Sequence, residues 1–317
     1  MANCPFCGES ANFHAAATDI EYFTTPERFE FWHCKACDIL FISPMLADRL
    51  DVIYPSNYYA FQEVGRKSFP LRVKEWIDRR TLRRVLRGIQ GSTLRVLDVG
   101  GGTGWLAGIA RAADLRVTET WIVDLDDKAK SSAEAHGHCF FHGRIEDFDD
   151  HGKFDLILML NLVEHLPRPD LILARAAQML SPNGRIVIKT PNFRSLDALV
   201  FRHRSWGGYH CPRHFVLFSR ESLTRTLRDA GLAVDGFSYT QGAPFWCVSI
   251  MNQMRLAGWI SISAARSYAD HPLLPFLQIA AAGFDFARRP FSRLSQMVVI
   301  ARRDDSAADG DRRHTTV

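Results

Sequence analysis

Downstream of Leu94 the chain alternates between short, mainly apolar runs and longer segments with helical periodicity. Strands that alternate with helices in this way predict a parallel sheet covered by helices on both faces. We therefore expect an α/β domain over residues 91–303. The predicted strands are LRVLDV (94–99), TETWIV (118–123), FDLILML (154–160), GRIVIKT (184–190), and the later runs 233–239 and 296–301.

A basic segment, PLRVKEWIDRRTLRRVLRGI, precedes this domain and predicts a helix that ends at Gly88 and Gly91. Its arginines predict a solvated face, and binding of an acidic acceptor is the less favoured alternative. An aromatic stretch (Tyr54, Tyr58, Tyr59 and Phe61) lies upstream, so residues 46–90 are interpreted as a helical linker. The helix residues expected on one buried face are Leu71, Trp76, Ile77, Leu82, Val85, Leu86 and Ile89, and the arginines are Arg79, Arg80, Arg83, Arg84 and Arg87.

An apolar insert occupies residues 243–294, between the last two predicted strands. Its first half is long enough to suggest a membrane span, but Asn252, Gln253 and Arg255 fall near the middle, where a charge is costly in lipid. We expect two helices beside the acceptor site that form a lid, a dimer face or a surface resting on a membrane, with plain packing on the sheet as the alternative. Residues 304–317 are small and charged and predict a disordered tail.

Composition places few limits on partners. The chain has 317 residues, 47% of them hydrophobic and 23% charged, with a formal net charge of +4. This charge does not require a polyanionic partner. The first residues, MANCPFCGES, contain no basic segment followed by an apolar one, so no secretory signal is visible and a cytoplasmic protein is expected, with peripheral membrane contact left open.

Two C-x-x-C pairs lie near the start of the chain, Cys4 with Cys7 and Cys34 with Cys37. Paired cysteines at this spacing favour a structural zinc ion held by four thiolates, which leaves no open position for water. We therefore expect a zinc-ribbon-like module at residues 1–45, with a hairpin spanning the long gap between the pairs. A thioredoxin-like redox role is weaker, because neither pair opens a βαβ unit. The other cysteines, Cys139, Cys211 and Cys247, are interpreted as small apolar residues.

A glycine-rich turn, Asp98-Val-Gly-Gly-Gly-Thr-Gly104, follows the first predicted strand and precedes a helical segment. Gly100, Gly102 and Gly104 allow a tight turn and close approach of the backbone to a ligand. No lysine of a Walker loop is present, which argues against nucleoside triphosphates. Asp124, at the end of the second strand, suits the ribose hydroxyls of either a nicotinamide dinucleotide or S-adenosylmethionine, so these two features leave both cofactors open.

The fuller pattern resembles the class I S-adenosylmethionine-dependent methyltransferases, and in particular the ubiquinone-biosynthesis O-methyltransferase subgroup. The matching segments, over roughly residues 90–240, are the glycine-rich turn, TWIVDLDDKA, GRIED (143–147), NLVEH (161–165) and GRIVIKTPN (184–192). Many relatives of that subgroup also carry an N-terminal C-x-x-C module. The resemblance implies a Rossmann-like seven-stranded sheet in the order 3-2-1-4-5-7-6, with the seventh strand antiparallel.

The resemblance also implies a cofactor site. The turn would hold the methionyl end of S-adenosylmethionine and Asp124 the ribose. Arg144 stands where an acid is common in the family, so Ile145 or Glu146 is expected to contact the adenine. The expected cofactor-binding residues are Asp98, Gly100, Gly102, Gly104, Asp124, Leu125, Ile145, Glu146 and Asn161.

Four residues are candidates for catalysis: Glu164 and His165 after the fourth main strand, and His210 and His214 after the fifth. A histidine there could take the proton of a hydroxyl group, and the alternative is a purely structural role. The expected reaction is methyl transfer to a small-molecule hydroxyl oxygen, on a sugar, a phenol or a lipid-linked acceptor, by a monomer or an oligomer. One alternative is a nucleic-acid (RNA) methyltransferase. Enzymes that methylate a base amine usually have an Asn/Asp-Pro-Pro-aromatic stretch after the fourth strand, and this chain has Asn161-Leu-Val-Glu instead, which disfavours that alternative. The other is a nicotinamide-dependent oxidoreductase or a non-catalytic cofactor-binding protein.

Overall fold

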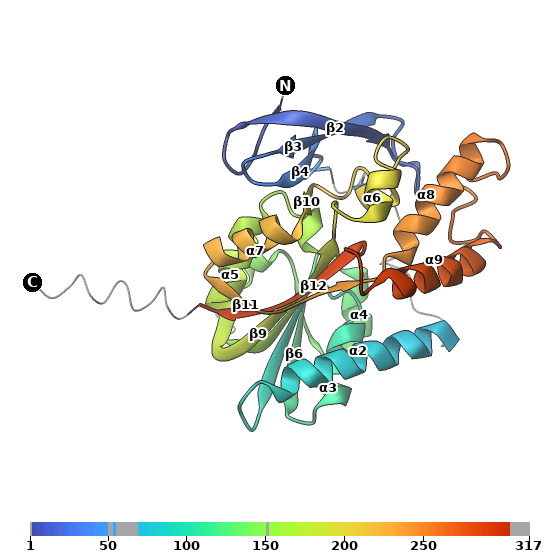
Figure 1. Cartoon of the computed structure of the whole chain (residues 1–317). Coiled ribbons are helices and arrows are strands. Elements are labelled where there is room, and N and C mark those ends of the chain that lie inside the picture. Colours follow the sequence, from blue (N-terminus) through green and yellow to red (C-terminus); the bar gives the residue numbers. More distant parts are fainter. Residues whose placement is uncertain (1, 50–52, 55–68, 150–151, 305–317) are drawn as a thin grey trace, which may run out of the picture.

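The computed structural model describes residues 2–49, 53–54, 69–149 and 152–304. Two sheets organise this part of the chain: a five-stranded sheet built mainly from the N-terminal residues, and a seven-stranded sheet flanked by helices (Figure 1). Tyr58, Tyr59 and Phe61 and the tail from residue 305 lie outside the described residues.

The seven-stranded sheet has the order β11-β12-β9-β8-β5-β6-β7. Numbered along the chain, this is the expected order 3-2-1-4-5-7-6. Neighbours among β5–β9 pair in parallel, whereas β12 is antiparallel to both β9 and β11, which confirms the predicted antiparallel seventh strand. The strands are β5 (Leu94–Val99), β6 (Val117–Asp124), β7 (Cys139–His142), β8 (Phe154–Leu160), β9 (Leu180–Pro191), β11 (Leu232–Thr240) and β12 (Gln296–Arg303).

Helices cover both faces of this sheet because its strands are apolar on both faces. Val96 and Leu158 belong to the core beneath α2 and α3, whereas Leu97 and Ile157 belong to the larger core that includes α5 and α7. Neighbouring residues of a strand point to opposite faces, and this alternation separates the two cores. α2 (Phe69–Arg87) precedes β5. The helical elements that follow are α3 (Trp105–Ala113), α4 (Lys128–Ala135), η2 (Ile145–Asp147), η3 (Val163–His165), α5 (Pro169–Met179), α6 (Leu196–Val200), η4 (Gly207–Tyr209) and α7 (Arg220–Asp229).

Among the α2 side chains that the structure describes, the buried ones lie in the second half of the helix, and the side chain of Leu71 lies outside the described part. Leu82, Val85 and Leu86 pack on the sheet, but Trp76 and Ile77 are 60% and 50% exposed. The prediction for these two residues is wrong because the first half of α2 extends past the edge of the sheet (Figure 1). The five arginines of the helix are exposed, in agreement with a solvated face.

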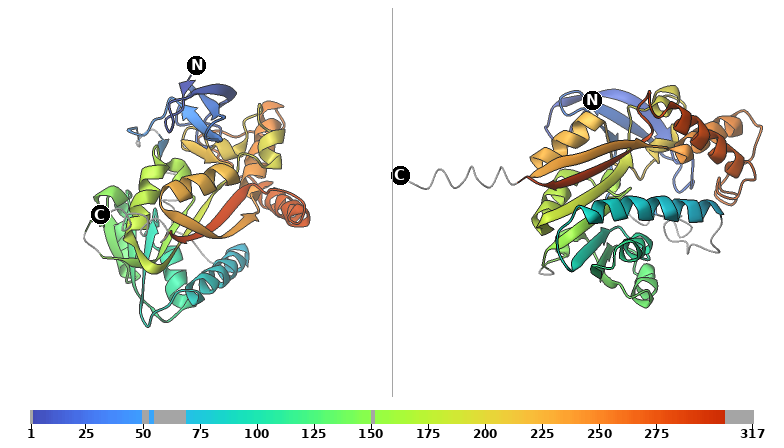
Figure 2. Two further views of the ribbon diagram at one scale, coloured as in Figure 1. Left: turned by 60° about the vertical axis from the view of Figure 1, so that its left-hand side comes forward. Right: turned by 60° about the horizontal axis from the view of Figure 1, so that its bottom comes forward.

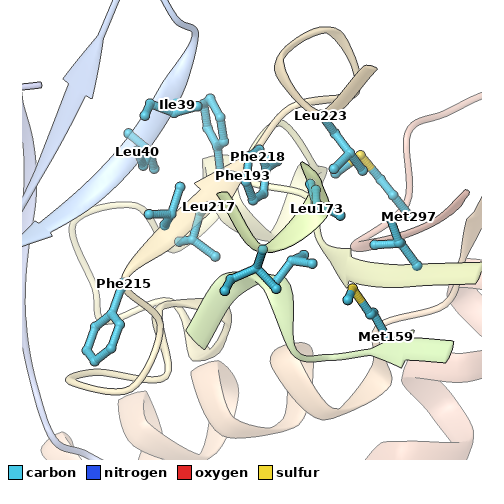
Figure 3. Packing of buried hydrophobic residues seen from close by; sticks show 14 of the residues in the cluster. Ile39, Leu40, Met159, Leu173, Phe193, Phe215, Leu217, Phe218, Leu223 and Met297 are labelled. Atoms are coloured by element: carbon cyan, nitrogen blue, oxygen red, sulfur yellow. The ribbon is translucent and has the colours of Figure 1, made fainter. Parts of the chain in front are cut away.

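The N-terminal strands do not form a sheet alone. β1 (Ala2–Asn3), β2 (Ser10–Thr18), β3 (Arg28–Cys34) and β4 (Ile39–Ser43) form an antiparallel sheet, and β10 (Val216–Phe218), from beyond the fifth main strand, adds to the edge of β4. Leu40 of β4 pairs with Leu217 of β10, and Figure 3 shows both in a core that also contains Met159 and Met297 of the main sheet. The two sheets therefore share one hydrophobic core.

The insert forms two helices, α8 (Ala243–Leu256) and α9 (Leu274–Arg288), which stand beside the main sheet (Figure 2). Asp285 of α9 joins them: it is buried and accepts hydrogen bonds from the Gly242 amide at 2.8 Å and the Trp246 indole at 3.2 Å. Among the described residues, no helix has the length and apolar character needed to cross a membrane.

Candidate functional site

The glycine-rich turn connects β5 to α3 at the carboxyl edge of the main sheet. Gly100, Gly102 and Gly104 have φ angles of 70°, 52° and 80°, in the left-handed region that favours glycine. A Cβ atom on Gly104 would lie 2.5 Å from the His138 ring. At this position glycine is required both by the backbone conformation and by the space available.

Asp98 begins this turn with a buried carboxyl group. One of its oxygens, Oδ2, has no hydrogen-bond partner among the described residues. Burial, and then the nearby negative charge of Asp124, raise the pKa of Asp98 to about 7. A buried carboxyl group with an unused oxygen is suited to a cationic ligand, which would stabilise its ionised form.

Asp124 ends β6 and faces the same turn. Its carboxylate accepts hydrogen bonds from the Gly102 amide at 2.8 Å and the Asp126 amide at 2.9 Å. Burial raises the pKa of Asp124 despite these contacts. Each carboxylate oxygen can accept a second hydrogen bond, so the group can still bind hydroxyls. Leu125, the next residue, is 47% exposed.

The turn after β7 lies next to Asp124, since the Gly143 amide donates to the Asp124 carbonyl at 3.0 Å. Ile145 is buried and belongs to the main core, whereas Glu146 is exposed. The structure thus separates the two expected adenine contacts: Glu146 faces solvent and Ile145 supports the turn from inside.

A second turn, Asn161–His165, lies directly against the glycine-rich turn. A Cβ atom on Gly100 would meet the Leu162 side chain at 3.1 Å. Asn161 has a left-handed φ of 53°, and its side-chain oxygen accepts a hydrogen bond from Gln296 at 3.3 Å. The expected cofactor turn and the expected catalytic turn are therefore neighbours.

Glu164 points into the protein from this turn. Its Oε2 accepts a hydrogen bond from the Thr190 hydroxyl at 2.8 Å, and Oε1 has no partner among the described residues. Burial raises the pKa of Glu164 to about 8, so the group is mainly protonated at neutral pH.

The structure brings His165, His210 and His214 together from two segments. Their ring centroids are 4.7 Å apart for His165 and His214, 4.9 Å for His210 and His214, and 6.0 Å for His165 and His210. The ligand atoms of Glu164, His165 and His214 all lie within 4.8 Å of one another, close enough to hold a metal ion.

The three histidines differ in their partners. Nδ1 of His214 donates to the Gly208 carbonyl at 2.8 Å, and Nδ1 of His165 lies 3.0 Å from the Tyr54 hydroxyl. Burial lowers the pKa of His165 to about 3 and that of His214 well below its ordinary value. Both rings are therefore neutral at physiological pH.

Sequence reasoning missed residues 19–24, a loop of the N-terminal sheet. Glu21 lies 2.7 Å from His210, and Asp19 forms a 3.0 Å ion pair with Arg213. These partners are 189 and 194 residues apart in the chain, and no spacing rule connects them.

The insert also borders this site. The Ser249 hydroxyl of α8 accepts a hydrogen bond from the Gly207 amide at 2.8 Å, just before His210. Phe245 packs edge-on against Trp206, whereas Trp259 and Phe276 are more than 70% exposed. Through Phe245 and Ser249, α8 thus supports the loop that carries His210 and His214, which we call the histidine loop.

Cys4, Cys7, Cys34 and Cys37 form a cluster at one end of the N-terminal sheet. Their sulfur atoms all lie within 4.8 Å of one another, with separations of 3.9 Å for Cys4–Cys37 and 3.6 Å for Cys7–Cys34. A tetrahedral ion with metal–sulfur bonds of about 2.3 Å has sulfur–sulfur edges of roughly 3.8 Å. The separations of 3.9 and 3.6 Å lie on either side of this value, so the cluster suits one tetrahedral ion.

Comparison with known proteins adds independent findings. A family described as "Methyltransferase domain" matches residues 71–235. A ubiquinone biosynthesis O-methyltransferase of Aromatoleum aromaticum is 34% identical over 179 residues, which cover 51% of this chain and 70% of that protein. One from Azorhizobium caulinodans is 34% identical over 120 residues, or 34% of this chain and 44% of its own length.

Among solved structures, coclaurine N-methyltransferase bound to N-methylheliamine and SAH aligns with a TM-score of 0.50 and 13% identity, covering 80% of each chain. At this identity the likeness concerns the fold alone.

Proposed function

The chain belongs to the class I S-adenosylmethionine-dependent methyltransferases, and from this we propose that it methylates a hydroxyl oxygen of a small molecule bound at the histidine cluster. One observation carries the proposal: three histidines from two distant segments meet at the turn Asn161–His165, whose Leu162 side chain lies against Gly100 of the glycine-rich turn. Family membership removes the nicotinamide-dependent alternative.

For the cofactor, we assign the methionyl end to Asp98, with Gly100, Gly102 and Gly104 allowing its close approach. Asp98 suits the cationic ammonium group because its Oδ2 is buried without a partner among the described residues. We assign the ribose hydroxyls to Asp124. Leu125, Ile145, Glu146 and Asn161 are proposed to complete the site around the nucleoside.

S-adenosylmethionine supplies an activated methyl group, so the protein has two tasks: to align the acceptor oxygen and to remove its proton. A histidine ring can accept that proton, and His165, His210 and His214 are the candidates. Protonated Glu164 could hold the acceptor by a hydrogen bond, because its Oε1 has no partner among the described residues.

The O-methyl character of the acceptor is supported by relatives named as ubiquinone biosynthesis O-methyltransferases. A phenolic acceptor is our first choice, ahead of sugars, because α8 places aromatic and apolar side chains next to the histidine loop. A lipid-linked phenol is a further candidate acceptor, and the assay described below includes it.

We propose that the four cysteines bind one structural zinc ion. Their geometry supports this, and their closed shell would leave the ion no role in methyl transfer. We also propose a cytoplasmic location, because a reducing compartment keeps cysteines available as thiolate ligands.

Calorimetry and methyl-transfer assays test the proposal. Asp124→Ala should weaken S-adenosylmethionine binding about tenfold or more, since charge-assisted hydrogen bonds contribute roughly 1.5–3 kcal/mol. Asp127→Ala, an exposed side chain that makes no cap hydrogen bond, is the matched control. Labelled S-adenosylmethionine should then label the oxygen of a catechol, a sugar or a lipid-linked phenol. Equal affinities for the two variants, or labelling only of RNA or of nitrogen, would overturn the assignment.

A further inference from the structure

We propose that the N-terminal module takes part in catalysis, with Glu21 as a positioning residue that makes His210 the general base. This inference rests on the proposed methyl transfer to a hydroxyl group. It assigns a task to a module whose cysteines alone suggest only a structural role.

The contact between Glu21 and His210 is short and protected. Oε1 of Glu21 lies 2.7 Å from Nδ1 of His210, and the two side chains are 19% and 8% exposed. An ionised carboxylate can only accept a hydrogen bond, so the proton of the neutral ring must sit on Nδ1. Nε2 is then the nitrogen that can take a proton from an acceptor.

The loop that carries Glu21 is fixed by Asp19. The Asp19 carboxylate accepts hydrogen bonds from the amides of Glu21, Tyr22 and Thr24, at 3.2, 3.0 and 3.0 Å. These bonds give Glu21 a defined position relative to the rest of its loop.

The same loop also contacts Arg213, three residues after His210. Asp19 pairs with Arg213, and neither side chain is exposed. The Tyr22 ring packs edge-on against His210 at 6.0 Å and lies under the Arg213 guanidinium at 4.5 Å. His210 itself has a left-handed φ of 38°, a conformation disfavoured for histidine that these surrounding contacts hold in place.

A carboxylate partner distinguishes His210 from the other two histidines. In the hydrogen bonds described above, His214 donates to a backbone carbonyl and His165 pairs with a tyrosine hydroxyl. An acid that fixes the tautomer and then stabilises the imidazolium is the arrangement by which histidine bases are activated.

The reaction step balances with these groups. The acceptor O–H proton passes to Nε2 of His210 while the oxygen forms a bond to the methyl carbon. The carbon–sulfur bond of S-adenosylmethionine breaks with its electron pair on sulfur, giving S-adenosylhomocysteine. The positive charge lost from sulfur is matched by the imidazolium that faces Glu21.

The test compares full-length wild type with Glu21→Gln, Glu21→Asp and, as a control, Glu27→Gln, whose position is exposed on the same module. Two-bond ¹H–¹⁵N spectra report the ring tautomer without any acceptor, and His210→Gln identifies the signal. The wild type and the control should show the proton on Nδ1. In Glu21→Gln the amide can donate to Nδ1, so the proton should move partly or wholly to Nε2.

Methyl transfer to catechol, or to another acceptor of the panel above, provides the second readout. Glu21→Gln should lower kcat about 10²–10⁴-fold with little change in KM, the range typical of a lost general base. Glu21→Asp should recover part of this rate. S-adenosylmethionine affinity should match the wild type in all variants, which shows that the fold is intact.

An unchanged tautomer in Glu21→Gln, or a kcat within twofold of the wild type, would overturn the role of Glu21 while leaving the methyltransferase assignment intact. If the wild type methylates no acceptor of the panel, the proposed function fails, and the tautomer alone then decides whether Glu21 controls His210.

Discussion

The buried ion pair between Asp19 and Arg213 should contribute a large part of the stability that joins the N-terminal module to the main domain. Both side chains are fully buried and 3.0 Å apart. Burial alone would raise the pKa of Asp19, but the hydrogen bond and charge of Arg213 and the amides of Tyr22 and Thr24 lower it from 3.8 to about 2. At about 1.4 kcal/mol per pKa unit, this shift corresponds to roughly 2.5 kcal/mol.

Asp19→Asn keeps the shape of the side chain but leaves the Arg213 charge buried without its counterion. Removal of one partner from a buried pair typically costs about 3–5 kcal/mol, so we expect the free energy of unfolding to fall by about 3 kcal/mol at pH 7. Urea titration followed by far-UV circular dichroism measures this difference. Asp170→Asn, which breaks an exposed pair with Arg168, is the control and should cost less than about 1 kcal/mol.

The pH dependence has a defined sign. Because the folded pKa of Asp19 lies below its ordinary value, its contribution is present above about pH 4 and is lost as the pH falls towards 2. The difference between wild type and Asp19→Asn should therefore be constant near neutrality and shrink in acid. A cost at pH 7 no larger than that of Asp170→Asn would refute the reasoning, as would a cost that did not change between pH 5 and 2.

Three further changes test other parts of the structure. The pKa of Asp98 is about 7 before the cofactor binds, so binding of cationic S-adenosylmethionine at pH 6 should release close to one proton. The affinity should therefore rise up to about pH 7 and then level off. Calorimetry in two buffers measures the proton release, which Asp98→Asn should abolish. Cys34→Ser should lower bound zinc well below one ion per chain by metal analysis, whereas Cys247→Ser, remote in sequence from both pairs, should retain it. Replacing residues 246–287 with a short linker should preserve cofactor binding but lower methyl transfer, because α8 supports the loop that carries His210; unchanged transfer would exclude a role for the insert in the acceptor site.

The sequence alone was sufficient for the place of the strands of the main sheet and of the glycine-rich turn. Each βαβ unit is a local structure with apolar strands and a right-handed crossover, so the strands themselves can be found from local patterns. Their order in the sheet was implied by the resemblance to the class I methyltransferases. The left-handed glycines of the turn and the C-x-x-C pairs are equally local, since a few neighbouring residues impose them. The periodicity of α2 was less informative: it shows which side is apolar, but not how far the sheet extends beneath it, and Trp76 is exposed for that reason.

Only the tertiary structure could show that the N-terminal module and the histidine loop form one unit. β10 joins a sheet whose other strands lie more than 170 residues earlier, and its three residues resemble any short apolar run. Glu21 and His210 meet because two loops are held by a buried ion pair and a shared core, and neither loop has a repeat or spacing that encodes its partner. Local patterns record what a residue's own neighbours require, whereas contacts across the chain depend on the packing of whole elements.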